Sequence, residues 1–159
     1  MTVVIGDGKE RWDWVLSIAN PAAPTAAELN GGTRLSQWMT KDGATGFGAD
    51  TADAPTSSKE AKFATAVNGM RSLNNPRLRM MKQTGTDTGY IAMTTDAFGF
   101  LVRRNSLDAT TAYSSGQKVD VFSVQLSQKT KVDQDDNMPE RYDVPVKLQA
   151  DPNYDATVA

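Results

Sequence analysis

The sequence has no cysteine and no histidine among its 159 residues. Their absence excludes disulfides, cysteine nucleophiles, Ser-His triads and histidine general bases, and it removes most zinc sites. The sequence also lacks an apolar run near the roughly 20 residues that a membrane-spanning helix needs, and a basic N-terminal segment followed by an apolar stretch. We therefore expect a protein that stays in the cytoplasm where it is made and binds no membrane, unless a larger assembly carries it elsewhere.

Charges of the two signs are nearly balanced, with 17 basic and 19 acidic residues and a net charge of -2. A basic nucleic-acid binder needs a clustered positive field to hold phosphates. One basic cluster consists of Arg71, Arg77, Arg79 and Lys82, and no aromatic residue alternates with these side chains to stack bases. We interpret this cluster as a solvated strand face, or as salt-bridge partners of an acidic neighbour, rather than as a phosphate track.

A tryptophan-rich segment near the N-terminus alternates apolar side chains with others. Every second residue is large and apolar over Trp12, Trp14, Leu16 and Ile18, and this period of two predicts a strand with one apolar face. The tryptophans suit either a stacking platform for sugars or bases, or a buried core. Because Leu16 and Ile18 continue the same face, we favour a core or a subunit interface.

The segment A-N-P-A-A-P-T-A-A-E-L-N-G-G that follows predicts a turn and a very short helix. Pro21 ends the preceding strand, because the residue before a proline is pushed towards extended geometry. Thr25 and Glu28 have the spacing of a capping box, in which each side chain hydrogen-bonds the backbone N–H of the other residue. Gly31-Gly32 ends the helix after little more than one turn, and a second strand is predicted over Arg34–Met39.

Alternating apolar residues predict five further strands. They are Lys62–Val67, Arg77–Lys82, Phe98–Arg104, Lys118–Lys129 and Tyr142–Leu148, with a short helix around Tyr90 and Met93. The apolar positions of Lys118–Lys129 change parity, which requires either a bulge or cover on both faces. Pro145 cannot donate a ladder hydrogen bond, so its strand lies at an edge or is distorted there. About seven strands and one or two short helices in a single domain of residues 1–159 make a mainly β fold.

The segment Lys41–Glu60 contains three glycines, many small or polar residues and a single large apolar residue, Phe47. A structureless stretch of this length is uncommon in a compact domain unless it has a function. We therefore predict an assembly loop, whose contact candidates are Lys41, Asp42, Phe47, Asp50, Asp53 and Lys59. Deletion of Gly43–Ser57 is then expected to leave a folded protein that no longer assembles.

None of the motif-like clusters predicts catalysis, a cofactor or a metal site. The acidic run Asp133–Asn137 begins like a calcium loop, but Met138 and Val144 stand where that loop needs Gly and Glu. The glycine pairs Gly6-Asp-Gly8 and Gly46-Phe-Gly48 lack the Gly-Lys-Ser/Thr ending of a phosphate-binding loop. Carboxylates are plentiful without a distinctive pair, so a small β-domain hydrolase that uses carboxylates stays open as an alternative.

Three segments taken together carry a family resemblance. The first is the stretch from Ile18 to Gly32 with its following strand, the second runs from Gly99-Phe-Leu-Val-Arg-Arg104 to Leu126, and the third is Tyr142–Leu148 with the tail Asp155–Ala159. In this order and at these spacings they resemble the major tail (tail tube) proteins of long-tailed phages, particularly phages of actinobacterial hosts. The resemblance implies a small β-barrel or β-sandwich with a flanking helix, and a structural protein rather than an enzyme.

The resemblance also implies that subunits form hexameric rings, which stack into a tube around a tape-measure protein. A tail terminator and distal tail proteins would bind the tube, which is assembled in the host cytoplasm and becomes part of the virion. DNA would pass along an acidic lumen without specific binding.

Within this resemblance, further surfaces are candidates for contact. Asp120, Asp143 and Lys147 share strands with the core and are candidates for lumen-facing residues. The N-terminal arm, residues 1–10, and the C-terminal tail, residues 151–159, are candidates for contacts between rings. A tail terminator or connector, which would form a single ring, is the alternative of the same class.

Overall fold

Eleven strands and two short helices make up the chain, and the computed structural model describes all of residues 1–159. The strands are β1 (Arg11–Val15), β2 (Thr33–Arg34), β3 (Met39–Thr45), β4 (Ala49–Pro55), β5 (Ala66–Leu73), β6 (Arg77–Met81), β7 (Phe98–Arg104), β8 (Lys118–Leu126), β9 (Thr130–Lys131), β10 (Arg141–Leu148) and β11 (Asn153–Thr157). The helices are α1 (Ala26–Asn30) and α2 (Thr88–Ala92). The mainly β fold predicted from the alternating pattern is therefore confirmed.

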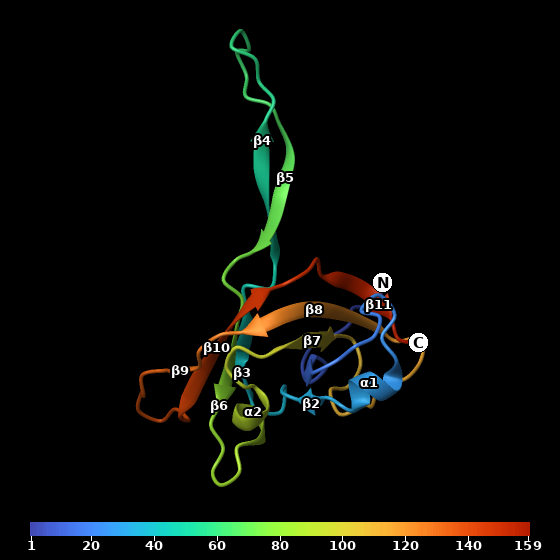
Figure 1. Ribbon diagram of the computed structural model, residues 1–159, viewed down its shortest axis with the longest axis vertical. Helices are drawn as coiled ribbons and strands as arrows, with labels where there is room; N and C mark the ends of the chain where they lie inside the picture. The colour runs from blue at the N-terminus through green and yellow to red at the C-terminus, as the bar shows by residue number, and fades with distance from the viewer.

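Nine strands form one antiparallel sheet that curls into a half-barrel, and β4 and β5 form a separate hairpin that projects from it (Figure 1). The order along the sheet is β2-β1-β7-β8-β10-β6-β3, with β11 beside β8 and β9 beside β10. β10 pairs with β6 through Arg141–Pro145 and with β8 through Val146–Leu148. β6 and β8 lie on opposite sides of β10, so Pro145, which pairs with Arg77 of β6 and accepts a hydrogen bond from Ser127 N just beyond the end of β8, stands inside the sheet and not at an edge.

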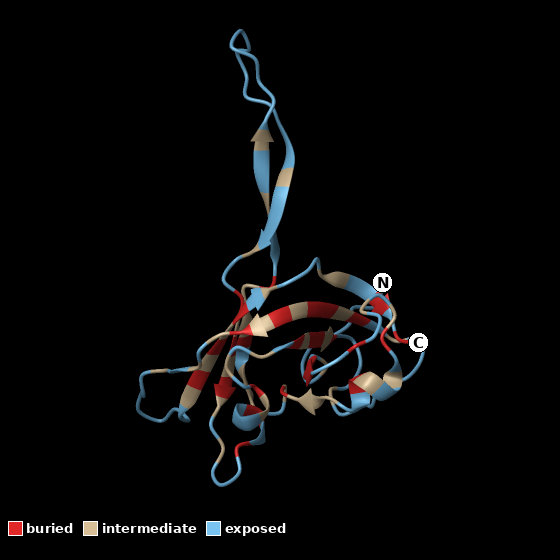
Figure 2. Cartoon of the chain, in the orientation of Figure 1, coloured by how far each residue is buried: buried red, intermediate tan, exposed pale blue.

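Buried side chains concentrate on the strands of the body (Figure 2), in one apolar cluster on each face of the sheet. β8 supplies both clusters, because Phe122 and Val124 belong to the larger one and Val119 and Val121 to the smaller one. The pairs between β7 and β8 stay in register from end to end. The parity change in β8 therefore reflects cover on both faces, the second of the two predicted alternatives.

The tryptophans are core residues, as predicted, but their strand is shorter than predicted. Trp12 and Trp14 are each 2% exposed and lie in the larger cluster. β1 ends at Val15, so Leu16 falls outside the strand and is 70% exposed, whereas Ile18 joins the smaller cluster. The prediction of one apolar face through Ile18 is wrong because the chain leaves the sheet before the alternation ends.

The capping box of α1 forms as predicted. Thr25 Oγ1 accepts a hydrogen bond from the Glu28 N–H at 3.3 Å, and the Glu28 carboxylate accepts from the Thr25 N–H at 2.9 Å. The strand predicted over Arg34–Met39 is wrong, because only Thr33–Arg34 forms β2. A turn closed by the hydrogen bond from Trp38 N to Leu35 O at 2.9 Å then leads into β3.

Four other predicted elements are confirmed. β7 has the predicted bounds, β6 and β10 match their predictions to within one residue, and α2 contains Tyr90. Among the helices of the chain, none has the length and apolar character to cross a membrane.

The segment predicted as a loop, Lys41–Glu60, contains most of two strands. β3 continues to Thr45 and pairs with β6, and β4 pairs with β5 to form the hairpin. The strand predicted over Lys62–Val67 is wrong except for its last two residues, since β5 begins at Ala66. Both predictions failed because the hairpin buries almost none of its side chains, so its strands need no apolar alternation.

Candidate assembly surfaces

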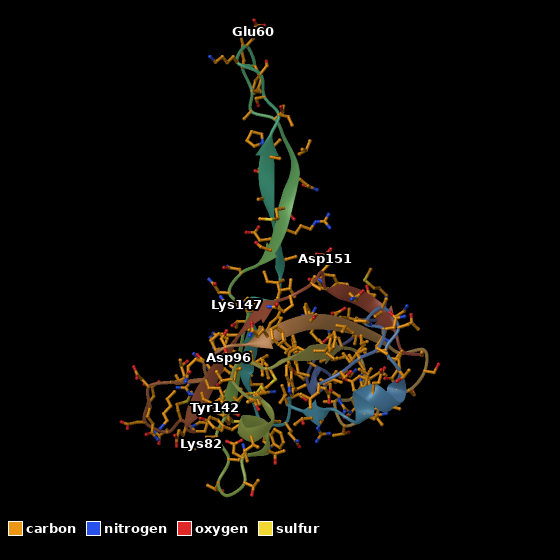
Figure 3. The ribbon with its side chains drawn as sticks, viewed as in Figure 1. Glu60, Lys82, Asp96, Tyr142, Lys147 and Asp151 are labelled. Atoms are coloured by element: carbon orange, nitrogen blue, oxygen red, sulfur yellow. The ribbon has the colours of Figure 1, made fainter.

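The hairpin of β4 and β5 stands clear of the body, and its side chains are exposed along most of its length (Figures 1 and 2). Ala49 pairs with Leu73 at its base. At its tip, where Glu60 lies (Figure 3), Thr56 N donates a hydrogen bond to Thr65 O at 2.9 Å. A two-stranded hairpin is only marginally stable alone in water. We therefore expect a partner molecule, and not the chain itself, to stabilise a projecting hairpin of this length.

A register shift sets the chemistry of the two hairpin faces. Thr51 pairs with Arg71, and Asp53 pairs with Asn68, so β5 has one residue more than β4 between these pairs. This is the arrangement of a β-bulge. Because directly opposed residues share a face, the extra residue changes the parity of β5 within the hairpin.

Around the bulge, in the middle of the hairpin, one face carries apolar and the other polar side chains, whereas nearer the base Asp50 and Ser72 continue the apolar side and Ala49 and Leu73 the polar side. The apolar hairpin face consists of Ala52, Ala54, Val67 and Met70; the polar hairpin face consists of Thr51, Asp53, Asn68 and Arg71. In a regular strand Val67 and Met70 would point to opposite sides. They are 58% and 81% exposed, and the sequence pattern missed them because their spacing of three fits no strand period.

Five of the six predicted contact residues are exposed. Asp53 lies on the polar hairpin face, Asp50 lies on the other face near the base, and Lys59 lies in the tip segment. Lys41 and Asp42 are on β3, at the edge of the body sheet. Thr40 Oγ1 donates a hydrogen bond to Asp42 at 2.8 Å, and this bond holds the pKa of Asp42 below its usual value.

The sixth residue, Phe47, is not a contact residue. Its side chain is 5% exposed, and its ring packs at centroid distances of 4.8 Å from Trp12 and 5.4 Å from Phe122. The prediction failed because the one large apolar residue of the segment belongs to the core and not to a partner. Deletion of Gly43–Ser57 would remove Phe47 and the end of β3, so it is expected to unfold the body, contrary to the sequence-based prediction.

The C-terminal residues belong to the body and not to a free tail. β11 pairs with β8, and Ala156 and Val158 are 6% and 1% exposed in the smaller cluster. The N-terminal arm is different, because Val3, Val4 and Ile5 are all exposed. The arm is thus exposed over three consecutive apolar residues, whereas the C-terminal segment buries Ala156 and Val158 and exposes residues such as Tyr154.

The outer face of the sheet over β7, β8, β10 and β6 is a further candidate surface, because the smaller cluster covers only the other half of that face. Gln125 pairs with both Phe98 and Lys147, which places these three side chains in one row across the sheet. We call this region the uncovered sheet face; it consists of Phe98, Gln125, Lys147, Pro145, Asp143, Arg77 and Arg79.

Asp143 holds two arginines flat against this face. Its carboxylate accepts hydrogen bonds from Arg79 Nε at 2.8 Å and Nη2 at 3.0 Å, and from Arg77 Nη1 at 3.2 Å. The hydrogen bonds from Arg79 hold the pKa of Asp143 below its usual value, and the same bonds raise the pKa of Arg79. The basic cluster interpreted as a solvated strand face is therefore partly neutralised within its own sheet.

Replacement of Asp143 should show a defined pH dependence. We expect Asp143→Asn to lower the free energy of unfolding by about 1–2 kcal/mol near neutral pH, the range for charge-assisted hydrogen bonds. Because the folded-state pKa is depressed, this contribution is present above the unfolded-state pKa and is lost as the pH falls through the folded-state value. Urea unfolding at a series of pH values should show the difference between the two proteins shrinking below about pH 4. A difference that is the same at all pH values would contradict this account.

Asp120, the remaining lumen candidate, lies on the opposite face of the sheet from Asp143 and Lys147. It pairs with Arg103 at 2.8 Å, and Arg103 in turn lies over the rings of Trp12 and Phe122 at the rim of the larger cluster. The structure therefore brings two of the three lumen candidates together and separates the third from them.

Three of the four buried charged residues, Arg11, Asp13 and Arg104, lie together beside β1, and the fourth, Asp87, caps α2. Asp13 is 0% exposed and accepts hydrogen bonds from Arg11 Nε at 2.8 Å and from the Tyr113 hydroxyl at 2.6 Å. Arg104 lies over the Tyr113 ring and donates to backbone carbonyls of residues 108–112. Burial raises the pKa of Tyr113, which keeps its hydroxyl available as a donor. The carboxylate of Asp13, the Tyr113 hydroxyl and both terminal nitrogens of Arg104 are hydrogen-bonded within the chain, and only Arg104 Nε has no partner, which indicates a structural role for the cluster.

An open groove of about 560 Å³ lies between the N-terminal arm and β3. Two carboxylates line it, Asp7 on the exposed arm and Glu10, which accepts a hydrogen bond from Trp12 Nε1 at 2.6 Å. The hydrolase alternative needs an enclosed cleft that holds a carboxylate pair, and this groove is open to solvent.

Taken together, these features define a structural building block: a β body with its own core that presents a hairpin, an arm and sheet edges to partners. The family whose model is described as "Phage tail tube protein" matches residues 1–159, the whole chain. The chain therefore belongs to the phage tail tube protein family, and it is a structural component of a phage tail.

Several chains of solved structures have a similar fold. One of them is a chain of the "Cryo-EM structure of the anti-feeding prophage (AFP) baseplate, 6-fold symmetrised", with a TM-score of 0.59 and 8% sequence identity. The similarity covers 96% of this chain and 95% of that chain, and at this identity it shows the fold alone. No curated protein sequence matches the chain.

Proposed function

We propose that the protein polymerises through its hairpin into stacked hexameric rings that form the tail tube of a long-tailed phage. The observation that carries this proposal is the hairpin from Ala49 to Leu73, which leaves the body and contributes little to its core. A contact of this kind, in which an arm of one copy meets a different surface of the next, is heterologous. Heterologous contacts repeat around rings or along filaments.

Two further features support assembly into rings. The strands β2 and β3 end the body sheet, and each has one edge without a partner strand. Unpaired edges invite aggregation unless they are covered, and closure across subunits covers them. The similar chain belongs to a baseplate described as 6-fold symmetrised, which agrees with six subunits in a ring.

In this proposal the tube surrounds a tape-measure protein and later conducts DNA, while terminator and distal tail proteins bind its ends. Assembly takes place in the host cytoplasm, and the protein uses no cofactor and catalyses no reaction. Arg77, Arg79 and Lys147 against Asp143 give the uncovered sheet face three positive charges and one negative charge, a formal balance of +2. A positive lumen would attract phosphates, so the lumen position of Asp143 and Lys147 needs its own test.

Negative-stain electron microscopy of the purified protein tests the proposed function. We expect tubes of indefinite length built from stacked rings. Isolated single rings would instead support a terminator or connector. A protein that stays monomeric at every concentration examined would overturn the proposal.

The same tubes test the lumen position. If Lys147 faces the lumen, a Lys147→Cys variant in assembled tubes should react with a small maleimide but not with a maleimide attached to a bulky polymer. Unassembled protein is the control, and it should react with both reagents. Equal reaction of the tubes with both reagents would place this face on the outside, and protection from both would place it in a subunit contact.

A further inference from the structure

The first five residues of the arm are an apolar segment without a partner. Val3, Val4 and Ile5 are 77%, 60% and 69% exposed, and residues 1–5 make no hydrogen bond to the rest of the chain. Valine and isoleucine are among the residues most enriched in strands. The arm therefore has the composition of a strand and, within a single copy, none of the contacts of one.

The hairpin has a free strand edge, with which an added strand can pair. β4 pairs only with β5, so the outer edge of β4 has free backbone donors and acceptors. This edge is regular from Ala49 to Ala54, whereas the bulge interrupts the edge of β5. The apolar hairpin face beside it leaves Val67 and Met70 exposed. A third strand would cover part of this face and would relieve the marginal stability of a two-stranded hairpin.

The positions of the two segments suit neighbours in a ring. Figure 1 shows the N-terminus at the right of the body beside β11, away from the base of the hairpin above β3 and β10. The arm therefore points away from the hairpin of its own copy. A rotation that repeats around a ring brings the arm side of each copy against the hairpin side of the next.

We propose that residues Thr2–Ile5 of one copy add as a third strand to the β4 edge of the hairpin of the neighbouring copy. The inference rests on the proposed function, since it needs the ring. Backbone hydrogen bonds supply the pairing, as in other cases of strand addition to a free sheet edge. Val3 and Ile5 share one side of the added strand, because strand side chains alternate, and that side extends the apolar hairpin face.

Engineered cysteines test this contact directly, because the natural chain has no cysteine. One chain carries Val4→Cys, which points to the side of the polar hairpin face, and a second carries a single cysteine on the same face of β4, as Ala49→Cys, Thr51→Cys or Asp53→Cys. The two chains are mixed, assembled and oxidised, and disulfide-linked dimers are counted on non-reducing gels. We expect at least one β4 position to give about tenfold more dimer than a Ser114→Cys control on the body, because the ring raises the effective concentration of the two thiols.

Two results would overturn the strand addition. In the first, tubes form by electron microscopy but no β4 position links to Val4→Cys above the control, so the proposed function survives and this inference fails. In the second, Val4→Cys links to β4 only when both cysteines are in the same chain. If no tubes form from the wild-type protein, the proposed function fails first.

A second variant tests the backbone pairing. Val4→Pro removes one backbone donor in a segment that makes no contact within its own copy, so the monomer should keep its thermal stability. Each variant is combined with Thr2→Cys, and the disulfide between residue 2 and the cysteine on β4 of the neighbouring copy is measured. We expect Val4→Pro to lose this disulfide and the matched Val4→Ala variant to keep it. An equal yield from the two variants would contradict strand pairing.

Discussion

A chain whose hairpin is cut back to its base should fold as a stable monomer and form no tubes. In this variant residues 50–72 are replaced by Asn-Gly, which joins the paired residues Ala49 and Leu73 by a two-residue hairpin turn. The body should keep its stability, because the removed side chains are exposed and the core residue Phe47 is retained. Sedimentation and electron microscopy should show monomers only, with a melting temperature within a few degrees of the wild-type value.

Two comparisons make this result specific to assembly. A full-length chain with Asn68→Ser, a change on the polar hairpin face, should still form tubes. Deletion of Gly43–Ser57 should instead give an insoluble or unfolded protein, because it removes Phe47 from between Trp12 and Phe122. Tubes of normal length from the cut-back chain would show that the hairpin is dispensable and would remove the basis of the proposed function.

Removal of the buried carboxylate of Asp13 should be the most destabilising single change in the body. Asp13→Ala leaves the Arg11 guanidinium buried and without its charged partner, and it takes the acceptor from the Tyr113 hydroxyl. Breaking a buried ion pair by removing one member costs about 3–5 kcal/mol. Against a typical total stability of about 5–15 kcal/mol, we expect a large fall in the urea midpoint.

Two control variants separate the buried charge from the loss of packing. Lys82→Ala breaks an exposed ion pair with Glu140, and such pairs contribute about 0–1 kcal/mol. The double variant Arg11→Met/Asp13→Ala also removes the buried, unpaired charge of Arg11, so it should be more stable than Asp13→Ala alone. A double variant that is less stable than Asp13→Ala would mean that the packing of the Arg11 side chain, and not its charge, dominates the effect.

The sequence predicted the body of the fold better than its assembly surfaces, for a physical reason. β7, β10 and the tryptophans of β1 bury side chains, and burial leaves an apolar period in the sequence. The hairpin buries almost nothing in its own chain, so β4 and β5 resembled a loop rich in small and polar residues. The bulge in β5 added to the difficulty, since it places Val67 and Met70 on one face at a spacing that no regular strand has.

The candidate site was predicted in part for the same reason. Composition drew attention to the segment that contains Asp50, Asp53 and Lys59, because a long segment without apolar periodicity is uncommon in a compact domain unless it has a function, and the role of these residues in assembly stays a prediction. Composition could not show whether Phe47 is a core residue or a contact residue, since a single large apolar residue in a polar stretch suits both positions equally well. Only the position of Phe47 beside Trp12 and Phe122 assigns it to the core.

The order of synthesis separates the hairpin from the completed body. β8 receives its neighbour β11 only after residues 153–157 have been made, and Val158 then fills the smaller cluster. Before that point a nascent chain already contains the arm and the hairpin but has an open cluster, and contacts between residues distant in sequence form slowly. In the proposed assembly, a subunit with this topology would carry its arm and hairpin on a finished body only after its last residues had been made.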